Sequence, residues 1–260
     1  MTIHQTHAPT VLVEIDGPIL VVTIGRPHAR NAIDRATSQA IADAIDRLDA
    51  DPQLTVGIIT GAGGHFSSGM DLKAFLAGER VELDGRGLAG ICETPPAKPL
   101  IAAVEGYALA GGCEIALACD LIVASNEARF GIPEVKTGLI AGSGGLVRLP
   151  QRVPRQIAME YALTGRMMTA AEAHRFGLVN RLAEPGQALD AARVLAREIA
   201  ANAPLSVAMS KRIVNEAGDW PADEVWTRQH ALLEEIVASE DAREGARAFA
   251  EKRRPNWQGR

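Results

Sequence analysis

Residues 106–125 read GYALAGGCEIALACDLIVAS, and this stretch decides the fold. It follows the β-branched run PLIAAVE at residues 99–105, which predicts a buried strand, and it ends in DLIVAS, which predicts another. Between the two runs, Gly111 and Gly112 stand where a helix through Ala118 would begin. A strand, a glycine turn, a short helix and a second strand are typical of an α/β core.

The glycines at the start of this helix also bear on function. The first turn of a helix leaves backbone N–H groups without partners, and glycine lets a ligand atom approach them closely. Such a position suits an anion or a developing oxyanion. We therefore interpret the Gly111 N–H as one oxyanion donor. A side chain at this position is expected to displace the ligand without disturbing the fold.

Glu114 lies in the first turn of the same helix, where two interpretations are open. The helix dipole favours a negative charge there, so the carboxylate can be a cap. Alternatively it is a catalytic group, because a helix and a strand of similar length bring the chain back and place Glu134 at the same end. Two buried carboxylates beside an oxyanion site suit proton transfer, and burial should raise the pKa of at least one of them. Read alone, Glu134 would be an ordinary loop residue after Pro133.

The loop GAGGHFSSGMDLKAF, residues 61–75, is the predicted source of a second oxyanion donor. It follows the predicted strand LTVGIIT and leads into a helix at Asp71, so the backbone N–H of Met70 is the candidate. The alternative is a plain strand-to-helix loop with Asp71 as the N-cap. Phe66 stands where the dinucleotide-binding fingerprint has its third glycine, which argues against a dinucleotide site.

Composition excludes several other classes of protein. A net charge of -5 and an aromatic content of 4% argue against nucleic-acid binding. No apolar run approaches the ~18 residues of a membrane span, and the amino terminus does not resemble a secretory signal, so we expect a cytoplasmic protein without membrane contact. Cys92, Cys113 and Cys119 form no CxxC pair and the six histidines include no HExxH, so we predict no metal site and expect the cysteines to be buried.

The rest of the chain extends the α/β pattern and then becomes helical. Further strands are predicted at TVLVEI, PILVVTI and LTVGIIT, residues 10–15, 18–24 and 54–60. Helical spacing of apolar residues occurs at 36–48 and, most clearly, in EPGQALDAARVLAREIAANA at 184–203. We therefore predict an α/β core over residues 1–195 and a helical C-terminal region over residues 196–260. No linker separates them, so the helices are expected to pack on the core or on a neighbouring subunit.

Four motifs, in this order and spacing, resemble the crotonase family, and most closely its enoyl-CoA hydratases. They are FSSGMDLKAF (66–75), KPLIAAVEGYALAGGCEIALACDLIVAS (98–125), ARFGIPEVKTGLIAGSGG (128–145) and LTGRMMTAAEAHRFGLVN (163–180). The likeness extends from about Val11 to the carboxyl terminus. It implies a crotonase-like spiral of ββα repeats that forms a layered core, followed by a helical region used in trimerisation.

The resemblance also implies an activity and a catalytic set. Met70 and Gly111 would hold the thioester oxygen, while Glu114 and Glu134 would orient one water and deliver a proton to C2. The implied enzyme is a lyase, an enoyl-CoA hydratase that adds water across the C2=C3 bond of trans-2-enoyl-CoA, as in fatty acid β-oxidation. Three alternatives stay open: an enoyl-CoA isomerase, a carnitinyl-CoA-type dehydratase, and a homologue that binds acyl-CoA without catalysis.

The loop RPHARNA, residues 26–32, resembles a family motif that lies beside the CoA nucleotide. Contacts to CoA or substrate are implied at Arg26, Ala29, Ser68, Asp71, Leu72, Lys73, Gly112 and Gly142. For Arg26 and Lys73 the alternative is a solvated surface charge. The resemblance implies no permanently bound cofactor, with coenzyme A as part of the substrate, and a homo-oligomer that is a trimer or a dimer of trimers.

Overall fold

The computed structural model describes residues 9–260 and contains two sheets. The larger has the order β1-β2-β3-β4-β6-β9, in which β1 is antiparallel to β2 and the other neighbours are parallel. Its strands are β1 (Val11–Asp16), β2 (Ile19–Ile24), β3 (Val56–Gly61), β4 (Leu100–Val104), β6 (Leu121–Ser125) and β9 (Arg181–Ala183). The smaller sheet contains β5 (Tyr107–Leu109), β7 (Arg129–Gly131) and β8 (Met168–Thr169). Each of the strand runs predicted from the sequence forms a strand of the larger sheet.

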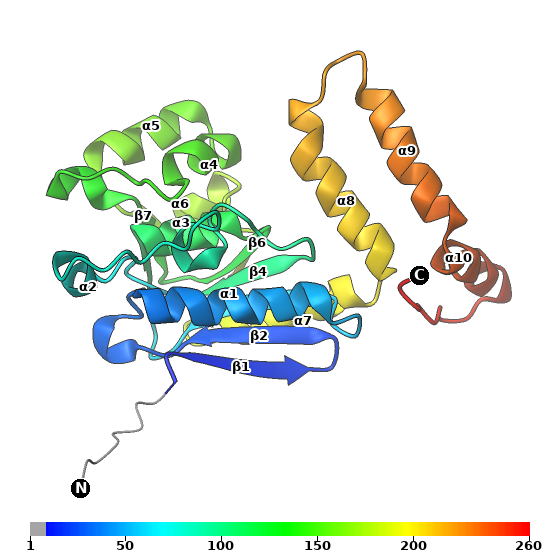
Figure 1. Cartoon of the computed structure of the whole chain (residues 1–260), viewed down its shortest axis with the longest axis horizontal. Helices are drawn as coiled ribbons and strands as arrows, with labels where there is room; N and C mark the ends of the chain where they lie inside the picture. The colour runs from blue at the N-terminus through cyan, green and yellow to red at the C-terminus, as the bar shows by residue number, and fades with distance from the viewer. Residues whose placement is uncertain (1–8) are drawn as a thin grey trace, which may run out of the picture.

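Helices cover both faces of the larger sheet (Figure 1). The α-helices are α1 (Arg35–Ala50), α2 (Leu72–Leu76), α3 (Gly111–Ala118), α4 (Gly145–Arg152), α5 (Arg155–Thr164), α6 (Ala170–Arg175), α7 (Ala188–Ala200), α8 (Pro204–Glu216), α9 (Val225–Ala238) and α10 (Glu240–Glu251). Alternate side chains of β2 explain the two-sided cover. Leu20 and Val22 share a buried cluster with Ile41 of α1, whereas Val21 belongs to a second cluster with Ala192 of α7.

The middle of the chain repeats one pattern of strand, short strand and helix. β4 continues into β5 and α3, and β6 continues into β7 and the 3-10 helix η3 (Pro133–Thr137). β3 is likewise followed by Ser67, which forms a parallel bridge to Ala108 of β5, before α2 begins. Successive repeats therefore stack their short strands in one layer, as the predicted spiral of ββα repeats requires. This stacking brings the starts of α2 and α3 together.

The C-terminal helices stand apart from the sheet (Figure 1). α8 and α9 form an antiparallel pair, and α10 lies at the far end of α9. The predicted boundary between residues 195 and 196 lies inside α7, which packs on the sheet, so the separate arm begins after residue 203. Lys211 joins the arm to the core, because its Nζ donates to the carbonyl oxygens of Pro96 at 2.7 Å and Lys98 at 2.9 Å and pairs with Asp120 at 2.7 Å.

Two further findings bear on the classes of function considered above. Within residues 9–260 no helix combines the length and the apolar character that crossing a membrane requires. The three cysteines, Cys92, Cys113 and Cys119, are buried and form no disulfide, which confirms that they pack as small buried groups.

Candidate active site

A cleft of about 1480 Å³ opens beside the starts of α2 and α3 and the helix η3. All of the residues predicted for the site line this cleft except Gly112. Gly112 is buried behind it, and a Cβ there would overlap the backbone carbonyl oxygen of Ser67. The structure therefore gives Gly112 a packing role that differs from the expected substrate contact. Glycine is required there because α3 packs closely on residue 67, and no substrate contact is needed to explain it.

The amides of Met70 and Gly111 lie side by side at the cleft. The Ile33 amide donates to the Gly69 carbonyl at 2.8 Å, and the Asp71 amide donates to the Ile33 carbonyl at 2.8 Å. Because neighbouring amides of an extended segment point in opposite directions, this pairing turns the Met70 N–H away from residue 33. The Gly111 N–H is the first of α3. Neither amide has a hydrogen-bond acceptor within residues 9–260, so both are free for a ligand oxygen.

The backbone conformation of Ala110 sets the direction of the Gly111 N–H. Ala110 precedes α3 with φ 51° and ψ -128°, a conformation that favours glycine, and no side chain caps the helix. Holding an alanine there costs on the order of 1–3 kcal/mol. The turn carries the chain from β5 directly into α3, so the strain coincides with the point at which the Gly111 N–H meets the cleft.

Glu114 is 3% exposed and holds the start of a different helix from its own. Its Oε1 accepts the amides of Ser143 at 2.7 Å and Gly145 at 2.8 Å, where α4 begins. Within residues 9–260 no side chain caps α3, so the interpretation of Glu114 as a cap of its own helix is wrong. Burial raises the pKa of Glu114 to about 7, and the nearby charge of Glu134 adds to the rise, while the two amides oppose it.

Glu134 lies in the first turn of η3 and lines the same cleft. Its Oε2 is buried and has no hydrogen-bond partner within the described residues. Burial raises the pKa of Glu134 as well. An unpaired buried carboxylate oxygen is costly, and water or a substrate at the cleft would satisfy it. The position is not that of an ordinary loop residue, because Glu134 adds a second carboxylate to the cleft that Glu114 lines.

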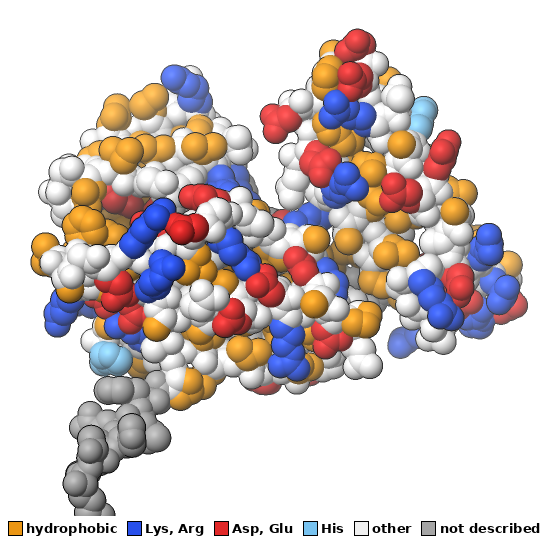
Figure 2. All heavy atoms as spheres, in the orientation of Figure 1, with side chains coloured by type: hydrophobic (Ala, Val, Ile, Leu, Met, Phe, Trp, Pro, Cys, Tyr) orange, Lys and Arg blue, Asp and Glu red, His pale blue; other side chains and the backbone are white. Residues whose placement is uncertain are grey.

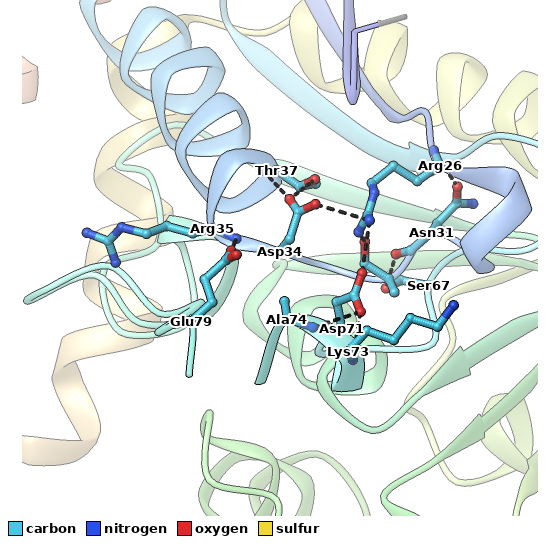
Figure 3. Close-up of polar contacts among 11 residues, drawn as sticks. Arg26, Asn31, Asp34, Arg35, Thr37, Ser67, Asp71, Lys73, Ala74 and Glu79 are labelled. Carbon is cyan, nitrogen blue, oxygen red and sulfur yellow. Dashed lines mark hydrogen bonds and ion pairs between the residues drawn. The ribbon is translucent and has the colours of Figure 1, made fainter. Parts of the chain in front are cut away.

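Arg26 lines the cleft, but its side chain is held in ion pairs. Its guanidinium pairs with Asp34 at 3.1 Å and with Asp71 at 2.9 Å, and its side chain is only 14% exposed (Figure 3). It is therefore not a solvated surface charge, and its Nη2 is already engaged by carboxylates. Asp71 is the N-cap of α2, since it accepts the amides of Lys73 at 3.0 Å and Ala74 at 3.3 Å. The expected N-cap role of Asp71 is confirmed, and this cap leaves the Met70 amide free.

Lys73 differs from Arg26 in being exposed. Its ammonium group makes no ion pair within the part of the chain that the structure describes, and it points away from the Arg26 cluster (Figure 3). Leu72 beside it is 56% exposed, which gives the cleft an apolar rim there. A cation and an apolar side chain at the mouth of a cleft suit the phosphates and the hydrocarbon parts of a CoA thioester.

Sequence reasoning missed the two amides that hold Glu114. The N–H groups of Ser143 and Gly145 are the donors that fix the Glu114 carboxylate, and neither residue is among those predicted for the site. The small-residue segment AGSGG at 141–145 carried the signal, because small residues at a helix start expose backbone amides. A carboxylate acceptor far from these amides in sequence could not be assigned without the fold.

Comparison with known proteins identifies related sequences and structures over nearly the whole chain. The family model described as enoyl-CoA hydratase/isomerase matches residues 14–260. The crystal structure of an enoyl-CoA hydratase from Mycobacterium tuberculosis H37Rv is 58% identical, with a TM-score of 0.96, and the match covers 97% of this chain and 100% of that one. One from Mycobacterium marinum is 61% identical with the same TM-score and coverage. The carnitinyl-CoA dehydratase of Salmonella arizonae is 47% identical over 94% of this chain and 96% of its own length.

Proposed function

The chain belongs to the enoyl-CoA hydratase/isomerase family, and from this premise we propose that it hydrates trans-2-enoyl-CoA thioesters. One observation carries the proposal: Glu114 and Glu134 line the same cleft as two unpartnered amides. Hydration requires a water to be activated for attack at C3 and a proton to be delivered to C2. Isomerisation only moves a proton, and a single carboxyl group can do this. The pair of carboxyls therefore favours hydration.

The two amides stabilise the charge that hydration creates. As water adds to C3, electron density moves onto the thioester oxygen, which becomes an enolate. Donors from Met70 and Gly111 strengthen as this charge develops, so they stabilise the transition state more than the bound substrate. Because the chain around both amides is fixed by its own hydrogen bonds, little reorganisation is needed at the moment of reaction.

The two carboxyl groups divide the proton transfers. Glu114 has one oxygen held by two amides, which leaves its other oxygen to orient a water. Glu134 offers a buried oxygen without a partner. With both pKa values raised, one group can be neutral and the other ionised near neutral pH. Hydration requires this combination, because the ionised carboxylate takes a proton from water and the neutral carboxyl group gives one to C2.

A dehydratase acting on carnitinyl-CoA is the second candidate, because relatives bear that name. Dehydration passes through the same enolate in reverse, so the same donors and carboxyls serve it. Its acyl group carries a quaternary ammonium, which a carboxylate can compensate. Glu93 also lines the cleft and is the observation that favours this candidate.

An absorbance assay tests the two candidates together. The protein is mixed with crotonyl-CoA, with longer trans-2-enoyl-CoAs, and with carnitinyl-CoA, and the conjugated thioester chromophore is followed while products are identified by mass. We expect loss of the chromophore and gain of one water with crotonyl-CoA. Turnover of carnitinyl-CoA alone would move the assignment to the second candidate. Binding of all the thioesters without conversion of any would overturn the catalytic proposal.

A further inference from the structure

Arg26 joins the starts of two helices that lie far apart in sequence. Asp34 caps α1 by accepting the Thr37 amide at 2.8 Å through Oδ1, and Asp71 caps α2 through Oδ1. The second oxygen of each carboxylate, Oδ2, contacts Nη2 of Arg26, at 3.1 and 2.9 Å. Figure 3 shows the guanidinium lying between the two caps. Its Nη1 also donates to the Ala32 carbonyl, so the cluster ties β2, α1 and α2 together.

Asp71 follows Met70 directly, so this cluster fixes the residue next to an oxyanion donor. The Asp71 amide is bound to the Ile33 carbonyl, and its carboxylate is bound to Arg26. The peptide between Met70 and Asp71 is thus held on both sides. Rotation of this segment by a few tens of degrees would swing the Met70 N–H away from its position beside Gly111.

The residues before Met70 are held by a second set of contacts that does not involve the Arg26 guanidinium. Ser67 Oγ donates to the Asn31 carbonyl at 2.8 Å and accepts the Gly69 amide at 3.1 Å. The side chain of Asn31 donates in turn to the carbonyls of Ala62 and His65, at 2.8 and 2.7 Å. The segment that leads into Met70 is therefore held in place without the Arg26 guanidinium. After Met70, the Asp71 amide is held by the Ile33 carbonyl, and only the Asp71 carboxylate depends on the guanidinium.

We infer that Arg26 is a positioning residue for the oxyanion hole, which sets the direction of the Met70 N–H through Asp71 and does not bind the CoA phosphates. The inference rests on the proposed function, since it assigns Arg26 a task in the same thioester site. Two observations support it. The Arg26 side chain is 14% exposed, and its Nη2 contacts two carboxylates. A phosphate that bound Nη2 would compete with both of these caps.

Phosphate binding and orientation of the Met70 N–H predict different effects on substrates with and without the CoA nucleotide. A group that binds the CoA phosphates acts only on substrates that contain them. A group that orients the Met70 N–H acts on every thioester, because the amide contacts the reacting carbonyl. Crotonyl-pantetheine lacks the nucleotide and its phosphates but keeps the thioester. It therefore separates the two roles in one comparison with crotonyl-CoA.

The experiment compares Arg26→Gln with wild type on both substrates. We expect kcat to fall by on the order of 10- to 100-fold with crotonyl-CoA and by the same factor with crotonyl-pantetheine, since displacing a catalytic group by about 1 Å costs this much. KM should change less than threefold. Arg193→Gln is the matched control, because Arg193 is also 14% exposed and also pairs with two carboxylates, on Glu14 and Asp16, away from the cleft. It should leave kcat on both substrates unchanged.

A spectroscopic measurement reports on the donor itself and needs no turnover. Butyryl-CoA labelled with ¹³C at C1 has no double bond to hydrate, and the infrared stretch of its carbonyl falls in frequency when donors bind the oxygen. We expect this stretch in the complex with Arg26→Gln to return part of the way toward its frequency in water. Asp71→Asn keeps a capping side chain but loses the ion pair, so it should give the same shift. The effects of Arg26→Gln and Asp71→Asn on kcat should not add in the double variant, because both variants remove the contact between Arg26 and Asp71.

Each outcome of these experiments either supports or overturns the positioning role of Arg26. A large rise in KM with crotonyl-CoA alone would assign Arg26 to the CoA phosphates and overturn the inference. An unchanged carbonyl stretch in folded Arg26→Gln and Asp71→Asn would also overturn it. If wild type converts no thioester, the proposed function fails, but the infrared shift still tests the positioning of the Met70 N–H. Should Arg26→Gln not fold, Asp71→Asn carries the same test.

Discussion

A Cβ built on Gly111 would lie 3.3 Å from the amide nitrogen of Met70. A Cβ on Gly69 would in turn lie 2.5 Å from the Gly111 nitrogen. Glycine at both positions therefore lets the two proposed oxyanion donors lie close together. Gly69 also has φ 87°, a conformation that side chains rarely adopt. Close packing of two backbone segments, and not the side chain of Met70, builds this part of the site.

Gly111→Ala should lower turnover of the best enoyl-CoA by roughly 100- to 1000-fold, the scale for a lost oxyanion donor. A Cβ here would meet the tip of the Leu88 side chain, which must shift to make room. A fall in unfolding free energy of about 1–3 kcal/mol should accompany the kinetic loss. Gly218→Ala is the control, since nothing lies within 4 Å of a Cβ there. Kinetics and thermal melts check both, and full turnover with a lowered melting temperature would limit Gly111 to packing.

Replacing either cleft carboxyl should stop proton transfer while leaving the substrate bound. Glu114→Gln and Glu134→Gln should each lower hydration by at least about 100-fold, the usual scale for a lost general acid or base. Glu216→Gln, an exposed carboxylate on α8, serves as the control. Stopped-flow absorbance gives the rates and fluorescence titration gives the affinities. Near wild-type turnover in either cleft variant would refute the two-carboxyl mechanism.

Glu114 should also make stability fall as pH rises. Burial moves the pKa of Glu114 from its usual 4.5 to about 7, so between these values the folded state binds more protons than the unfolded state. The free energy of unfolding therefore decreases with rising pH across this window and levels off above about pH 7. Glu114→Gln should remove this part of the slope and stabilise the protein at pH 8 by on the order of 1–3 kcal/mol. Calorimetry at a series of pH values compares the variant with wild type, and parallel curves would contradict the assignment.

Ala110→Gly should raise stability without loss of activity. The positive φ of Ala110 is relieved by glycine, while the unfolded chain gains some freedom, so we expect a net gain of about 1 kcal/mol. Ala116→Gly in the middle of α3 should instead cost about 1 kcal/mol. Denaturant titration measures both. A marked fall in kcat for Ala110→Gly would mean that the stiff alanine is itself needed to aim the Gly111 N–H.

The fold was predictable from sequence wherever local pattern and topology agree. Buried parallel strands are continuous apolar runs, so β3, β4 and β6 were evident, and the glycines marked the start of α3. The pairing of Glu114 with Glu134 was also accessible, because helix and strand lengths limit where the chain returns. The two amides and both carboxyls of the predicted site do share one cleft.

What the sequence could not show depends on contacts between distant segments. Arg26 and Asp71 are 2.9 Å apart in the fold, and no local pattern pairs them. A charged side chain in a loop resembles a ligand contact and a structural ion pair equally. The same holds for Gly112, whose neighbour Ser67 comes from another repeat. The burial of a side chain distinguishes a structural role from a ligand contact, and burial is known only once the chain is folded.

The arm formed by α8, α9 and α10 should pack against other subunits in a trimer. Its helices expose large apolar side chains, including Val214 at 80%, Trp226 at 66% and Val237 at 63%, and exposed apolar side chains also lie on the core over α5, where Leu163 is 69% exposed (Figure 2). These surfaces do not meet within one chain, so contact between the arm of one subunit and the core of the next would bury both and close a ring.

Sedimentation velocity at micromolar concentration should therefore show a trimer or a dimer of trimers. Val237→Glu places a charge in the proposed contact and should shift the distribution toward monomer, because an unpaired buried charge is costly. Gln53→Glu adds the same charge at an exposed turn far from the arm and should leave assembly unchanged. A wild-type protein that sediments as a monomer would refute the trimer, and Val237→Glu that stays assembled would place the contact elsewhere on the arm.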